Sequence, residues 1–145
     1  NAPKVQAAAG FLRQAGPVQL ADVRIACANP YAAIVVIALD DRPLADSKKV
    51  LIQAGTTCRP AGWAARPARF KAADTMVSGF RILDTGGSRW EIEKADAQVR
   101  LKNPALERAR ALDANLMPIR KLEATTDGGS LSVRLPEDAF YVLVD

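Results

Sequence analysis

Apolar and polar residues alternate over several short stretches of this chain. In the clearest stretch Val23, Ile25 and Cys27 alternate with Arg24 and Ala26. A period of two residues is typical of a β-strand with one buried face and one solvated face. This segment is therefore predicted to be a strand that turns its apolar positions toward a core.

The same pattern predicts about nine or ten strands in all. They cover residues 18–27, 32–39, 50–57, 80–83, 90–93, 98–102, 108–112, 119–124, 131–135 and 140–144. The 32–39 run is apolar throughout, which predicts a strand buried on both faces. Asp127-Gly128-Gly129 is the strongest short hairpin signal, and residues 84–88 are interpreted as another hairpin turn. Regular strands and turns predict an all-β fold, an antiparallel β-sandwich of the Ig-like or jelly-roll-like kind.

Two segments depart from this strand pattern. Residues 59–79 contain two prolines, two glycines and little periodicity, so we expect a long loop there. Long loops inside compact domains are often functional. Residues 104–112 place Leu106, Ala109 and Leu112 at helical spacing, which leaves a helix open as the alternative to a strand.

Length and composition indicate one ordinary domain over residues 1–145. The chain is 49% hydrophobic and 25% charged, and it contains no internal repeat or linker. No apolar run is long enough to cross a bilayer, so no transmembrane span is expected. The chain begins Asn1-Ala2-Pro3 without a signal-peptide pattern. We therefore expect it to be processed or to be a piece of a longer chain.

The chain contains no histidine. A Ser-His-Asp triad, a Cys-His dyad and a His-ligated zinc or copper site are therefore excluded. Two cysteines are also too few for a four-thiolate zinc site. Catalysis would have to use carboxylates, lysine or tyrosine, whereas a binding or structural role needs none of these.

The net charge of +4 arises from one segment. Between Arg59 and Arg89 there are six basic and two acidic residues, and elsewhere the two signs balance. Such a segment can attract an anionic partner, although solvated loop arginines are the simpler interpretation. A polyanion-binding module that uses residues 59–89 is thus one alternative function.

Trp63 lies in the irregular 59–79 segment, whereas the other aromatic residues fall mainly on predicted strands. Sugar-binding sites often stack an apolar sugar face on an exposed tryptophan or tyrosine. We predict that any glycan contact uses Trp63 as its stacking platform, with Arg59, Arg66 and Arg69 as polar partners. The other interpretation is that Trp63 packs the loop onto the sandwich. Trp90 falls on an apolar strand face and is expected in the core.

The two cysteines leave two states open. Cys27 and Cys58 each end a predicted strand on its apolar face. A disulfide requires Cα atoms within about 7 Å, so their strands would have to be adjacent or to face each other across a sandwich. Otherwise both residues are buried thiols.

Several carboxylates occur in close pairs. Glu91 and Glu93 share one strand face, but their basic surroundings favour a solvated surface over a glycosidase site. A structural calcium ion could take oxygens from residues 40–41 or from Asp113 with Asn115. Turn formation is the simpler role for both groups, and we expect no other cofactor.

The string ALDDRPLADSKKVLIQAGTTCRPAGW has a recognisable pattern. It resembles a stretch of large bacterial glycoside hydrolases in which one strand ends in S-L-D-G-K-P-L. In those enzymes a serine, a basic residue and an apolar strand follow, and then a V-G-T-x-x-R-P-x-G-W turn. The segments GFRILDTGGSRWEIEKADAQVRLKN, ARALDANLMPIRKLEAT and LSVRLPEDAFYVLVD are similar to later parts of the same region. The resemblance runs from about Gly10 to Val144 and includes no catalytic motif. Two departures are Leu116, where glycine is usual, and Cys58, where a small or apolar residue is usual.

The resemblance implies the all-β module that follows the catalytic (β/α)₈ barrel in such enzymes. It implies a non-catalytic accessory domain for polysaccharide degradation, secreted or periplasmic, which binds a polysaccharide or oligosaccharide or supports the parent enzyme's catalytic domain. No nucleic acid or membrane partner is expected. The alternative is a purely structural or interaction domain without a ligand.

Overall fold

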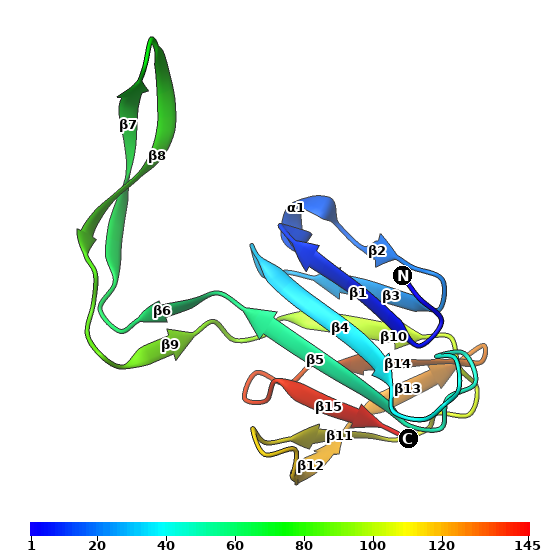
Figure 1. Cartoon of the computed structure of the whole chain (residues 1–145). Helices are drawn as coiled ribbons and strands as arrows, with labels where there is room; N and C mark the ends of the chain where they lie inside the picture. The colour runs from blue at the N-terminus through cyan, green and yellow to red at the C-terminus, as the bar shows by residue number, and fades with distance from the viewer. The chain divides into compact units, whose positions relative to one another are not determined.

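The structure is a computed structural model that describes all 145 residues, and it is almost entirely β (Figure 1). Its one helix is α1 (Leu12–Ala15). The strands are β1 (Val5–Gly10), β2 (Val18–Gln19), β3 (Val23–Cys27), β4 (Ala32–Ala38), β5 (Val50–Thr56), β6 (Cys58–Pro60), β7 (Ala64–Ala72), β8 (Thr75–Asp84), β9 (Trp90–Ile92), β10 (Ala97–Leu101), β11 (Ala109–Leu112), β12 (Pro118–Leu122), β13 (Ala124–Asp127), β14 (Ser130–Arg134) and β15 (Tyr141–Val144).

The chain forms two compact units. The sandwich unit consists of Asn1–Thr56 and Lys94–Asp145, and the hairpin unit consists of Thr57–Glu93. The hairpin unit is thus inserted in the sequence between β5 and β10 of the sandwich unit. The single domain over residues 1–145 stays a prediction.

The sandwich unit contains two antiparallel sheets. One sheet has the strand order β1-β4-β5-β15-β11-β12, and the other has the order β13-β14-β10-β3-β2. The all-β, antiparallel sandwich prediction is therefore confirmed. The strand count was underestimated, because the two sheets alone contain eleven strands and the hairpin unit adds four.

The hydrophobic core is built from the inward positions of both sheets. The residues exposed by 1% or less include Val23, Ile25, Ile34, Val36, Val50, Ile52, Val99, Leu101, Leu131, Val142 and Val144. Alternate residues of each strand point to opposite faces, so their neighbours point out of the sandwich. Burial of this apolar surface is the main source of stability for the fold.

Strand β4 differs from its prediction. Its burial alternates between buried and half-buried positions, with Ile34 and Val36 inside and Val35 and Ile37 partly exposed. A wholly apolar run therefore did not require burial on both faces. Apolar side chains on an outer sheet face are common, because folded proteins lack enough polar surface to cover themselves.

The hairpin unit replaces the predicted 59–79 loop. Strands β7 and β8 pair over their whole length, and the chain reverses at Ala73-Asp74 (Figure 1). Ala73 has a φ of +50°, as a tight two-residue turn requires. Strands β6 and β9 form a second, three-pair ladder. Residues 84–88 consequently connect two ladders and are not the hairpin turn that we predicted.

The remaining local predictions have mixed outcomes. Residues 109–112 form strand β11, so the helical alternative is wrong. Asp127-Gly128-Gly129 joins β13 to β14 as predicted. Both cysteines are thiols, and Cys58 is exposed where a buried residue was expected. No helix of this chain has the length and apolar character needed to cross a membrane.

Candidate functional site

Trp63 is half-buried in the turn that follows β6. Its backbone N–H donates to the carbonyl of Pro60 at 3.1 Å, and its indole Nε1 is buried without a hydrogen-bond partner. The guanidinium carbon of Arg59 lies 5.8 Å from the centre of the indole ring, in a cation–π contact. One ring face is therefore already occupied, which favours the packing role for Trp63 over the stacking platform.

The arginines predicted to accompany Trp63 do not converge on it. Arg59 lies beside the indole, but Arg66 and Arg69 are on β7, three residues apart. Residues three apart on a strand point to opposite faces. Arg66 pairs with Arg81 on one face of the hairpin, and Arg69 pairs with Ser78 on the other.

Trp90 is the more exposed of the two tryptophans. Its side chain is 64% exposed on β9, where it pairs with Pro60. The expectation that Trp90 belongs to the core is therefore wrong. The strand assignment was right, but the ladder of β6 and β9 has only two strands and nothing covers this face.

We expect Trp63→Ala to loosen the hairpin unit and Trp90→Ala to leave it intact. Trp63 loses half-buried packing and its cation–π contact, which together are worth about 1–2 kcal/mol. Amide hydrogen exchange at Ala61 and Gly87 should then accelerate about tenfold in Trp63→Ala only. If Trp63→Ala instead weakens polysaccharide binding and leaves this exchange unchanged, Trp63 is the glycan platform predicted from the sequence.

The β7–β8 hairpin exposes apolar side chains on both faces. The cross-strand pairing places Met76, Phe80 and Ile82 on one face and Phe70 and Val77 on the other. Phe80 is 70% exposed and Ile82 is 52% exposed. Basic residues accompany them on each face, namely Arg69 and Lys71 on the first and Arg66 and Arg81 on the second.

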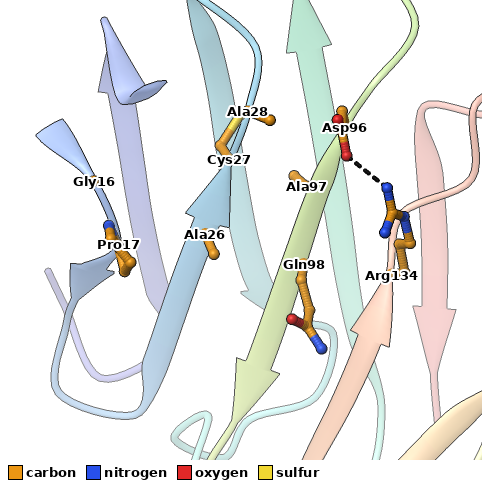
Figure 2. A pocket seen from close by; sticks show the side chains of 9 residues that line it. All are labelled: Gly16, Pro17, Ala26, Cys27, Ala28, Asp96, Ala97, Gln98 and Arg134. Atoms are coloured by element: carbon orange, nitrogen blue, oxygen red, sulfur yellow. Dashed lines mark hydrogen bonds and ion pairs between the residues drawn. The ribbon is translucent and has the colours of Figure 1, made fainter. Parts of the chain in front are cut away.

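The sandwich unit has a separate pocket of about 380 Å³ at one end of its five-stranded sheet. Figure 2 shows Gln98 of β10, Ala26 of β3 and Arg134 of β14 lining it. Asp96, just before β10, forms an ion pair with Arg134 at 2.8 Å. The pocket therefore offers carboxylate, amide and guanidinium groups within one small space.

A buried asparagine holds the Asp96 backbone in place. Asn29 is 4% exposed, and its Nδ2 donates to the carbonyl of Lys94 at 2.8 Å. Its Oδ1 accepts from the backbone N–H of Asp96, also at 2.8 Å. The Sγ of Cys27 is 3.6 Å from the same oxygen. These contacts give the pocket a rigid wall.

A second hollow of about 210 Å³ adjoins this pocket on the outer face of the same sheet. It is lined by Arg24, Ala26, Gln98, Arg100 and Ser132. The two hollows share Ala26 and Gln98. Among their lining residues, Gln98, Arg100, Ser132 and Arg134 have side chains that can hydrogen-bond the hydroxyls or the anionic groups of a small ligand.

Ion pairs near the last strand shift several pKa values. The ammonium of Lys94 donates to Glu137 at 2.8 Å, which lowers the pKa of Glu137 and raises that of Lys94. The two-pronged contact with Arg120 lowers the pKa of Asp138 and raises the pKa of Arg120. These carboxylates are therefore charged at neutral pH and serve as anchors for the 137–138 turn.

The carboxylates considered for calcium serve turns. Asp40 accepts from the backbone N–H of Lys48, the main cause of its lowered pKa, and from that of Arg42. Asp113 accepts from the N–H groups of Asn115 and Met117. No group of three or more histidine, cysteine, aspartate or glutamate side chains could hold a metal ion. A calcium site stays a prediction.

The sequence interpretation did not identify the arginines of the outer sheet face as a group. Arg24, Arg100 and Arg134 each occupy an outward position of an alternating strand. That alternation was the available signal. Which strands lie side by side depends on pairing between residues far apart in the chain, which local patterns do not report.

Comparison of the chain with known protein families, curated proteins and solved structures finds no match.

Proposed function

We propose that this chain is a non-catalytic β-sandwich module of a polysaccharide-degrading enzyme, and that its hairpin unit docks on the catalytic domain of the parent enzyme. The observation that carries the docking role is the exposure of apolar side chains on both faces of the β7–β8 hairpin. A two-stranded hairpin is marginally stable by itself in water. Exposed apolar patches of this kind mark interaction surfaces.

The chemistry of the hairpin favours a protein partner over a glycan. Four of its exposed apolar residues are flexible or branched aliphatic ones, each 45% to 59% exposed, and two are aromatic, Phe70 at 37% and Phe80 at 70%; the aliphatic four are Met76, Val77, Ile82 and Leu83. Sugars stack on flat aromatic rings, whereas aliphatic side chains pack against the aliphatic surface of another protein. The bound glycan predicted from the sequence would therefore use a different part of the molecule.

The charges of the hairpin predict the character of the docking surface. Arg66 and Arg81 face each other across the two strands, and neither has a salt bridge in the structure. Like charges placed opposite each other are unfavourable until a counter-charge lies between them. We therefore expect an apolar patch with acidic residues at its rim on the catalytic domain.

The test uses the double variant Phe80→Ser, Ile82→Ser. The adjoining domain encoded in the same reading frame is produced separately, and its binding to this chain is measured by calorimetry. Both changed side chains are exposed, so the fold should survive, whereas removal of two central apolar contacts should weaken docking about a hundredfold.

Ile119→Ser is the matched control, because Ile119 is a 49% exposed strand isoleucine of the sandwich unit. It should leave docking unchanged. The proposal fails if the reading frame encodes no polysaccharide-degrading domain, or if the double variant binds that domain as tightly as the unmodified chain.

A further inference from the structure

Two arginines face each other on the outer surface of the five-stranded sheet. Arg24 of β3 and Arg100 of β10 are direct cross-strand partners, and both point away from the core. Arg100 reaches the carboxylate of Asp127 at 3.6 Å and donates to the backbone carbonyl of the same residue at 3.4 Å, whereas Arg24 takes part in none of the salt bridges of the structure. Direct opposition of like charges destabilises a sheet pair. The guanidinium of Arg24 therefore lies beside that of Arg100 without a carboxylate of its own to neutralise it.

The surroundings of this arginine pair form a small binding surface. The next pair across the sheet is Arg100 with Ser132 of β14, and Gln98 lies two residues from Arg100 on the same face. Together with Ala26 these residues line the 210 Å³ hollow. Its polar groups near the arginine pair are hydrogen-bond donors or can act as donors. An oxyanion would accept from several of them at once.

From this geometry we propose that the outer face of β3, β10 and β14 binds an acidic saccharide. The carboxylate of a uronic acid residue would lie between Arg24 and Arg100. Its ring hydroxyls, or those of the neighbouring sugar, would reach Gln98 and Asp96 in the adjoining pocket. This site is in the sandwich unit and does not depend on docking by the hairpin unit.

The mixture of groups favours a saccharide over other anions. Gln98 both donates and accepts hydrogen bonds, and Asp96 accepts them. This combination suits the hydroxyl groups of a sugar, whereas the carboxylate of Asp96 would repel a further anionic group of a ligand such as a diphosphate. A nucleic acid strand would need aromatic side chains for base stacking, and the outward positions of these strands are arginine, alanine, glutamine and serine. An apolar peptide would meet arginine, glutamine and serine side chains around the 210 Å³ hollow, which offer it little apolar surface.

The test measures binding of trigalacturonate to the full chain by calorimetry, with neutral trigalactose as the uncharged comparison. We expect trigalacturonate to bind and trigalactose to bind at least tenfold more weakly. Added salt should weaken trigalacturonate binding, because the contact is charged and exposed. Arg24→Gln and Arg100→Gln should each weaken it about tenfold.

Arg42→Gln is the matched control. Arg42 is an exposed arginine of the same sandwich unit, and it lines neither hollow. It should leave binding unchanged, which separates a specific site from general attraction by surface arginines. Thermal unfolding provides a second measurement, since Arg24→Gln removes a like-charge pair and should not lower the melting temperature of the unliganded chain.

Four results would overturn the proposal. They are absence of trigalacturonate binding, equal binding of trigalactose, equal loss in Arg42→Gln and Arg24→Gln, and binding of inorganic phosphate or short single-stranded DNA as tight as that of trigalacturonate. Amide shift changes confined to Gln98, Arg100 and Ser132 would support it. If Arg24→Gln is poorly folded, Arg100→Gln and these shift changes decide the question.

Discussion

Replacement of Asn103 by alanine is expected to lower the free energy of unfolding by about 3–5 kcal/mol. Asn103 is 1% exposed. Its Nδ2 donates to the carbonyls of Leu44 and Ser47, both at 2.7 Å, and its Oδ1 accepts from the N–H of Ala105 at 2.9 Å.

The physical reason is that alanine removes three hydrogen bonds and supplies none. Each backbone group left without its partner then costs about 1–3 kcal/mol in desolvation free energy, because water has poor access to it. Leu44 itself is fully buried, so the segment that carries it cannot move outward without exposing apolar surface. A domain of this size has a total stability of about 5–15 kcal/mol, so a large part of it depends on this side chain.

Urea denaturation followed by far-ultraviolet circular dichroism measures this effect. Asn115→Ala is the matched control, because Asn115 is exposed in a turn and its side chain makes no hydrogen bond in the structure. We expect a change of less than about 0.5 kcal/mol for the control. Equal midpoints for the two variants would show that water replaces the lost amide at residue 103.

Gly86→Ala is expected to open the junction of the two ladders in the hairpin unit. Gly86 has a φ of +76°, which an L side chain rarely adopts. A Cβ there would lie 2.7 Å from the carbonyl oxygen of Ala61 and 2.9 Å from Cβ of Pro60. The first of these atoms is backbone and cannot rotate away, so the chain around residues 60–62 has to shift.

The hydrogen bonds of this junction should break first. The N–H of Ala61 donates to the backbone carbonyl of Arg89 at 2.7 Å, and the N–H of Gly87 donates to the backbone carbonyl of Ala61 at 2.9 Å. We expect their amide hydrogen exchange to accelerate at least a hundredfold. The docking proposed above should weaken as well, because the β7–β8 hairpin would be held less rigidly.

Gly62→Ala is the control for backbone strain. Its φ of +84° is similar, but the nearest atom to its added Cβ is 3.9 Å away. The Gly62→Ala variant should therefore lose only about 1–2 kcal/mol of stability, because alanine must adopt the left-handed backbone conformation. Both tryptophans lie in the hairpin unit, so their fluorescence reports this unit separately from the sandwich. Identical fluorescence and exchange for the two glycine variants would exclude the steric explanation.

The misassigned 59–79 segment shows where local patterns lose their information. Alternation identifies a strand only when one of its faces is buried and the other is solvated. The β7–β8 hairpin has apolar and basic side chains on both faces, so no period of two is present. Pro67 also argued against a strand, but β7 belongs to a two-stranded ladder with a free edge, where proline is tolerated.

The candidate sites show the same limit. Trp63 and Arg59 were grouped correctly because they are close in the chain, and the structure brings them into contact. Arg24 and Arg100 are 76 positions apart in the sequence, and only strand pairing makes them neighbours. Trp90 shares a face with Pro60 and Ile92, but its exposure depends on whether a further layer covers that face.

Local sequence patterns were enough to predict the all-β class, the antiparallel sandwich, the inward residues of strands such as β3 and β14, and the 127–129 turn. Each depends on residues within about ten positions of one another, where side-chain period and turn chemistry act directly. Leu116 is a position where the resemblance and the backbone conformation agree although the residue differs. It occupies a position where the resemblance expects glycine, and its φ of +63° shows the conformation that glycine would favour.

Which strands are neighbours, which faces stay uncovered and which arginines meet follow from long-range strand pairing in the folded chain. The division into a sandwich unit and a hairpin unit has the same origin, because β6 pairs with β9 although residues 61–89 lie between them in the chain. Such pairings are selected by the burial that the whole fold achieves, and the free energy of that burial is not encoded in any one segment.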